Sequence, residues 1–141
     1  VETVSTNQFA VLQQKALELQ ERVDAFFVAP WASIKGEKGE YVPPEEVSRW
    51  YLEHITIPEA TGNAQYVQYG LLCAADDSGY QQAFEAVRIA HQILSQGADP
   101  ATYRPVSPGR GKLVVNRSRA RQLGVTLTPE MGIEEYIGGD T

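Results

Sequence analysis

The chain has 141 residues, of which 43% are hydrophobic, and its formal net charge at pH 7 is −6. This length allows one domain with a buried core, so we expect a single domain over residues 1–141. The negative charge argues against nucleic acid or an anionic membrane surface as a partner, because both would repel the chain.

The first 29 residues predict a helix followed by a buried strand. Residues 1–5 alternate weakly, which favours a short strand, and Ser5 with Gln8 forms a capping-box pattern. Apolar side chains then repeat at helical spacing up to Val23. Residues 25–29 are apolar without interruption, which is typical of a central strand covered on both faces.

The middle of the chain alternates between loop, helix and strand. Residues 35–42 are rich in glycine and charged side chains, so we predict a mobile loop there. The proline pair 43–44 favours the start of a helix. Residues 55–58 begin the next strand, and residues 66–75 hold another.

The last third predicts a long amphipathic helix that ends before Gly97 and Pro100. Its apolar side chains fall at three- and four-residue spacing: Tyr80, Ala83, Phe84, Val87, Ala90, His91 and Leu94. Residues 112–116 predict a strand, and Asn116 is placed to cap a short helix after it. Residues 128–136 are partly helical, and residues 138–141 form a frayed tail.

This alternation predicts the fold class. Short connections and right-handed crossovers between strands and helices give a three-layer, doubly wound α/β domain. Its sheet is mostly parallel, with helices on both faces.

Residue types that support catalysis or metal binding do not form a recognisable unit. His54 and His91 lie on predicted helices without a second ligand at metal-binding spacing, so packed histidines are favoured and no metal or cofactor is expected. Cys73 lies in an apolar run, which indicates a small buried side chain and not a reactive thiol. Arginine and lysine cluster between Arg104 and Arg121, which in an acidic protein indicates a solvated surface. We therefore do not expect an enzyme.

A binding site is predicted where strands end, because α/β folds bind ligands at the carboxyl edge of the sheet. Trp31 and Ser33 follow the first buried strand, and the indole could stack on a flat ligand or face an ammonium group. Alternatively, Trp31 packs under the neighbouring glycine-rich loop.

Polar residues from the next two strands are expected at the same edge. Glu59, Thr61 and Asn63 end one strand, so a carboxylate and two neutral polar groups would converge there. Asp76 and Asp77 follow another strand, where they could contact a ligand or cap a helix. Such a set suits a zwitterionic solute.

Several of these segments occur in an order that resembles the second half of a known family. The corresponding segments are Val23–Val28, Ile57–Glu59, Gly79–Tyr80, Ile93–Gly97, Ala98–Pro100, Leu113–Asn116, Ala120–Val125 and Thr128–Pro129. The chain is similar to the C-terminal half of periplasmic ABC-transporter substrate-binding proteins that import amino acids, tryptophan and tyrosine among them. Where that family places an aspartate-asparagine pair that faces the ligand, this chain has Ala29-Pro30-Trp31-Ala32-Ser33.

The resemblance implies a trimmed half of a two-lobed receptor that closes on its solute by a hinge motion. Implied partners are a small polar or amino-acid-like solute and the membrane permease of an ABC importer, in a periplasmic or other extracytoplasmic location. The helix from Tyr80 would pack in the other lobe and the strand after Lys112 would cross back. Without that lobe, the chain is expected to dimerise or exchange a strand.

Two other functions stay open at this point. The chain could be a sensor or regulatory domain of a larger signalling protein. A hydrolytic enzyme built on the edge at Asp76 and Asp77 is a further alternative.

Overall fold

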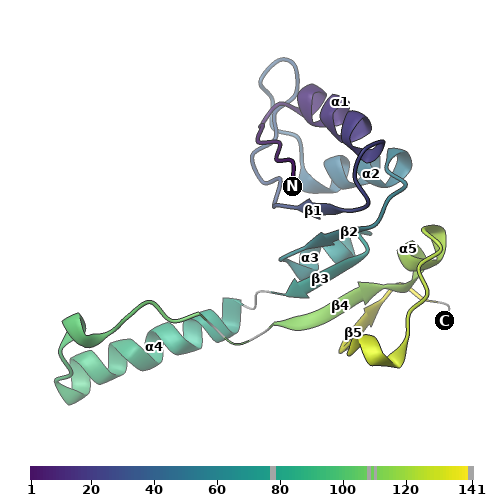
Figure 1. The fold of residues 1–141 in the computed structure, drawn as a ribbon. Coiled ribbons are helices and arrows are strands. Elements are labelled where there is room, and N and C mark those ends of the chain that lie inside the picture. Colours follow the sequence, from purple (N-terminus) through teal and green to yellow (C-terminus); the bar gives the residue numbers. More distant parts are fainter. Residues whose placement is uncertain (77–78, 108, 110, 140–141) are drawn as a thin grey trace.

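A computed structural model describes residues 1–76, 79–107, 109 and 111–139, and shows an α/β sheet (Figure 1). In this part of the chain, five strands pair in the order β1-β2-β3-β4-β5, and each pair is parallel except the antiparallel pair β3 and β4. The strands are β1 (Phe26–Val28), β2 (Glu59–Thr61), β3 (Cys73–Asp76), β4 (Lys112–Asn116) and β5 (Glu135–Ile137). The predicted fold class, a mostly parallel sheet with helices, is confirmed.

Helices lie on both faces of this sheet. They are α1 (Phe9–Gln20), α2 (Pro44–His54), α3 (Ala64–Gln68), α4 (Gly79–Gln96) and α5 (Arg117–Gln122), with 3-10 turns at Pro100–Thr102 and Pro129–Met131. On one face, Val67 of α3 packs against Ala74 and Val114. On the other face, Ala120 of α5 packs against Val115. Since adjacent residues of a strand point to opposite faces, Val114 and Val115 divide the sheet between these two layers.

The largest cluster of buried side chains lies where α1, α2 and the loop after β1 meet. Its buried members include Val28, Trp31, Val47, Tyr51 and Leu71. These buried contacts hold α2 against β1. They also fix the position of the loop that carries Trp31.

Three local predictions were wrong. Residues 1–5 form no strand, and the capping box is absent because Gln8 donates its backbone N–H to Thr6 Oγ1 at 3.1 Å. The predicted strand 66–75 instead begins within helix α3, which Asn63 caps by accepting the N–H of Gln65. Gly70, at φ 116°, then breaks the helix before β3 begins.

Residues 128–136 were expected to be partly helical, and this prediction is wrong for the second half of the segment. It forms the single turn Pro129–Met131, and then β5 begins at Glu135. In the predicted tail, Gly138 lies against Asn116, whose Oδ1 would be 2.9 Å from an added Cβ. Asp140 and Thr141 lie outside the described residues.

The predicted loop 35–42 is a tight hairpin tied to the start of α1. Gly36 donates its N–H to the Glu40 carbonyl at 2.9 Å, and Val42 donates to Ile34 at 3.0 Å. Lys35 exchanges backbone hydrogen bonds with Asn7 and Phe9. The mobility of this segment stays a prediction.

Helix α4 extends away from the sheet (Figure 1). It has 18 residues and none of them is buried. Tyr80 and Leu94, which belong to its predicted apolar stripe, are 79% and 84% exposed. The amphipathic pattern of the sequence therefore forms the expected helix, but no part of the described chain covers its apolar face.

Candidate functional site

The parallel strands β1, β2 and β3 end at one edge of the sheet, as the sequence predicted. Ser33 and Asn63 lie in the segments that follow β1 and β2, and Asp76 is the last residue of β3. Asp77 lies outside the described residues. This carboxyl edge is therefore the candidate site.

Asn63 and Asp76 meet at the first turn of α3. Asn63 Oδ1 accepts the N–H of Gln65 at 2.8 Å, and Asp76 Oδ1 accepts the N–H of Ala64 at 2.9 Å. Asn63 is exposed and Asp76 is half-buried. Asp76 therefore caps α3, the helix that precedes β3 in the chain. The hydrogen bond from Ala64 fixes the direction of the Asp76 carboxylate.

Trp31 packs inside the core below this edge. Its ring centroid lies 5.4 Å from that of Tyr51 and 5.5 Å from that of Tyr66, and its backbone N–H donates to Tyr66 Oη at 3.0 Å. The side chain is 6% exposed and belongs to the same buried cluster as Ile34 and Val42, which lie at the two ends of the predicted glycine-rich loop. Ser33, two residues later, is exposed.

Trp31 and its neighbour Tyr51 each bury a polar side-chain atom. Trp31 Nε1 and Tyr51 Oη have no hydrogen-bond partner among the described residues. Burial, and secondarily the carboxylate of Glu59, raises the pKa of the Tyr51 hydroxyl well above its usual range. Tyr51 therefore stays neutral and retains its proton as a potential donor.

Glu59 does not lie at the carboxyl edge, and this part of the prediction was wrong. It begins β2, and its buried carboxylate accepts Arg119 Nε at 3.0 Å, Arg119 Nη2 at 3.1 Å and the N–H of Leu72 at 2.8 Å. Arg119 also donates to the carbonyl of Ile55 at 2.8 Å. Thr61, at the other end of β2, is 2% exposed, so its side chain lies beneath the edge.

A cavity of about 760 Å³ lies beside β1. It is lined by residues 1–6, one side of α1, β1 itself and the loop that contains Trp31, Ser33 and Ile34. Tyr51 forms part of its inner wall. Trp31 and Ser33 therefore share this cavity, whereas Thr61, Asn63 and Asp76 do not line it.

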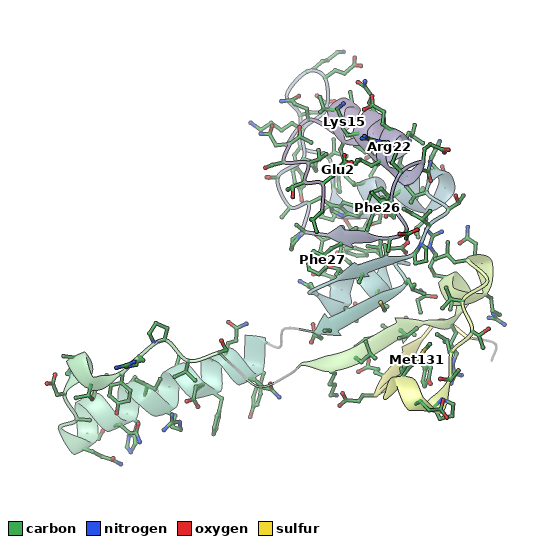
Figure 2. The ribbon with its side chains drawn as sticks, viewed as in Figure 1. Glu2, Lys15, Arg22, Phe26, Phe27 and Met131 are labelled. Atoms are coloured by element: carbon green, nitrogen blue, oxygen red, sulfur yellow. The ribbon has the colours of Figure 1, made fainter. Side chains whose placement is uncertain are left out.

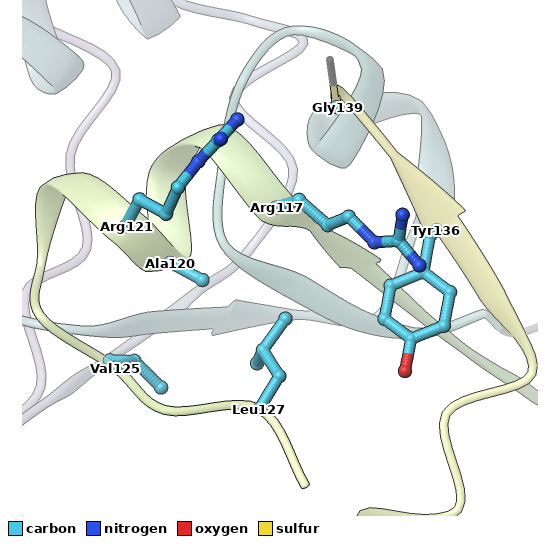
Figure 3. A pocket seen from close by; sticks show the side chains of 7 residues that line it. All are labelled: Arg117, Ala120, Arg121, Val125, Leu127, Tyr136 and Gly139. Carbon is cyan, nitrogen blue, oxygen red and sulfur yellow. The ribbon is translucent and has the colours of Figure 1, made fainter. Parts of the chain in front are cut away.

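A second cavity, of about 450 Å³, lies over α5 (Figure 3). Arg117 and Arg121 line it together with Tyr136, whose ring centroid lies 4.0 Å from the Arg117 guanidinium carbon. Because β4 is antiparallel to β3, α5 follows β4 at the end of the sheet opposite to Asp76. The sequence indicated these arginines only as part of a basic run, and Arg119 within that run is buried.

Cys73 is a free, half-buried cysteine. Burial, with a smaller effect of the Glu59 carboxylate, raises the pKa of the Cys73 thiol, as expected for an unreactive side chain. Among the described residues, no three His, Cys, Asp or Glu side chains gather as a metal site. In the same part of the chain, no helix has the length and apolarity needed to cross a membrane.

The mostly parallel sheet with helices on both faces is an α/β fold that also occurs in known proteins. Three solved structures share it: a conserved domain protein from Vibrio cholerae (TM-score 0.68, 16% identity), the L-Trp complex of an ABC domain from Streptococcus pneumonia (0.69, 19%), and a ligand-free, open substrate-binding protein with adhesive properties from Clostridium difficile (0.57, 17%). No protein-family model and no curated protein matches the sequence.

The similarity covers nearly all of this chain but less than half of each neighbour. It includes 95%, 97% and 99% of the chain, and 43%, 44% and 43% of the respective neighbours. The chain therefore spans less than half the length of the proteins whose fold it shares, and two of the three are described as ligand-bound or substrate-binding proteins.

Proposed function

We propose that this chain is the C-terminal half of a two-lobed receptor that delivers a small polar or amino-acid-like solute to an ABC importer, without catalysis. The solute would lie at the carboxyl edge of β1, β2 and β3, between this lobe and the other one. The other partner would be the membrane permease, and the location would be extracytoplasmic.

The observation that carries this proposal is helix α4. The chain leaves the sheet after Asp76, forms an 18-residue helix with no buried residue, and returns to pair Lys112 with Asp76. Exposed Tyr80, Phe84 and Leu94 give that helix an apolar face. A second body that covers this face would stand next to the edge that bears Asp76, so a cleft would form there.

The two crossings lie close together, as a hinge requires. Asp76 and Lys112 are paired across β3 and β4, and Gly111 lies so close to Asp76 that an added Cβ would overlap its carbonyl oxygen. Two adjacent backbone crossings allow one lobe to rotate on the other, which is how such receptors close on a ligand.

Within the cleft, we assign the charged contact to Asp76. Its carboxylate is held by the N–H of Ala64 and would pair with the ammonium group of an amino acid. Asn63, Ser33 and Asp77 would supply further hydrogen bonds. Buried Trp31 and Thr61 would support these residues from below.

The L-Trp complex of the similar ABC domain makes tryptophan the first solute to test. The assay is a thermal-shift screen of the complete receptor and of the chain alone against free amino acids. A solute at a hundredfold its Kd should stabilise the receptor by about 2.7 kcal/mol. This corresponds to a rise in Tm of roughly 5 to 10 °C for a domain of this size.

Asp76→Asn is the matched variant, because its amide oxygen can still accept the N–H of Ala64 while the charge is lost. We expect this variant to keep the Tm of the free protein and to lose the shift with amino acids. If no amino acid stabilises the complete receptor, or if Asp76→Asn responds like the native chain, the proposed site is wrong.

A further inference from the structure

The composition of β1 does not fit its place in the sheet. Residues 25–29 read Ala-Phe-Phe-Val-Ala, without charge, proline or glycine, and the sequence predicted a central strand from them. In the described chain, β1 pairs with β2 and its other edge is open. Natural edge strands usually carry charged residues, prolines or bulges that prevent further pairing. β1 has none of these, so it is suited to a neighbour on both sides.

Phe27 is the residue that presents the open edge. Phe26 donates its N–H to the carbonyl of Pro58 at 2.9 Å, so the backbone groups of Phe26 point toward β2. By alternation, the N–H and C=O of Phe27 point away from β2. Its ring is 75% exposed and lies on the face opposite to Phe26, which contacts Tyr51 (Figure 2).

The cavity of about 760 Å³ lies along this open edge. Residues 1–6 form one wall and residues 26–29 another, so the space occupies the position of a neighbouring strand. The four residues 26–29 give this wall a length of about 13 Å. The inner wall includes Leu19, Trp31 and Tyr51. The cavity thus offers a mostly apolar surface to a neighbouring strand.

We propose that an extended strand fills this cavity and pairs with β1 through Phe27, and that the polypeptide which completes the two-lobed receptor supplies it. This inference rests on the proposed function. The solved proteins of the same fold are more than twice as long as this chain, which covers 43–44% of them, so they contain polypeptide beyond the shared region.

The cavity also sets the chemistry of that strand. Its inward-facing side chains would be apolar, because Leu19, Trp31 and Tyr51 line the inner wall. Its outward-facing side chains would be aromatic or β-branched, because they would lie beside the exposed ring of Phe27.

Amide hydrogen exchange at Phe27, followed by NMR, tests this pairing. In the complete receptor, the Phe27 amide should exchange more than about tenfold more slowly than in the 141-residue chain. Equal rates in the two proteins would overturn the proposal. So would a slow Phe27 amide in a dimer of the 141-residue chain, because a second copy would then cover the edge.

A tethered strand tests the cavity without the rest of the receptor. The segment Val-Thr-Val-Thr-Val is fused before Val1 through a flexible glycine-serine linker of about ten residues, and Val-Thr-Pro-Thr-Val serves as the matched control, since proline disrupts the ladder. We expect slower exchange at Phe27 and changed Trp31 fluorescence with the first extension alone. Identical exchange with both extensions would overturn the proposal.

The result is separable from the proposed function. If the complete receptor protects the Phe27 amide but binds no amino acid, the proposed function is wrong and the strand pairing still holds. A receptor that binds amino acids while Phe27 exchanges freely would remove the strand and retain the function.

Discussion

Replacement of Arg119 by methionine should be among the most destabilising single changes in this chain. The guanidinium makes two hydrogen bonds to the Glu59 carboxylate and one to the Ile55 carbonyl, and the two side chains are 1% and 0% exposed. Methionine fills a similar length but leaves the Glu59 carboxylate buried with the N–H of Leu72. Loss of one partner of a buried pair costs about 3–5 kcal/mol. Total stabilities are about 5–15 kcal/mol, so this loss is a large fraction.

Urea unfolding of the 141-residue chain, followed by circular dichroism, measures this loss. The matched control is the double variant Arg119→Met with Glu59→Leu, which removes both charges. Because two apolar side chains need no pairing, we expect the double variant to be much more stable than Arg119→Met alone. A loss below about 1 kcal/mol in the single variant would place this pair with solvated surface pairs and refute the reasoning.

Three further changes have defined outcomes. Gly111→Ala should lower the Tm and disturb the pairing of β3 with β4, because the added Cβ would overlap the Asp76 carbonyl oxygen. Gly109→Ala is the control and should keep the native Tm, because the space around Gly109 is open. Equal Tm values for the two variants would contradict this. Phe84→Glu should reduce self-association of the 141-residue chain in sedimentation experiments, because Phe84 is 62% exposed on α4; an unchanged mass would exclude that face from the contact. Cys73 should react slowly with a thiol reagent at pH 8 and rapidly in urea, because burial raises its pKa in the folded state. Fast reaction of the folded chain would contradict the burial. The unfolded thiol has the lower pKa, so the free energy by which the neutral Cys73 thiol favours the folded state is fully present below a pH of about 8.5. It is lost as the pH rises further.

Elements with strong local patterns could be predicted from the sequence. Pro44 begins α2, the spaced apolar residues form α4, and Asn116 caps α5 by accepting the N–H of Arg119. In each case the determining groups lie within a few residues of one another, so the sequence shows them directly.

Features that depend on distant residues could not be predicted. The buried partner of Glu59 is Arg119, 60 residues later, and nothing near Glu59 in the sequence indicates it. Helix α3 has five residues, too few for a periodic pattern, and it depends on Asn63 and on Asp76, which lies 12 residues beyond the Ala64 that it caps. Trp31 was correctly placed after β1, but its burial follows from Tyr51 and Tyr66, which the sequence does not bring together.

At two places, the local sequence and its surroundings in the structure disagree. Phe27 belongs to an apolar strand with an open edge, and Phe84 belongs to an amphipathic helix with a bare face. Burial of such residues contributes about 1.5–3 kcal/mol per large side chain, so sequences rarely retain them in groups on a free surface. The open edge of β1 and the exposed apolar face of α4 lie on opposite sides of β2 and β3. A partner polypeptide that covers both would have to add to the sheet at β1 and also meet α4, which is the arrangement expected if the rest of a two-lobed receptor surrounds this chain.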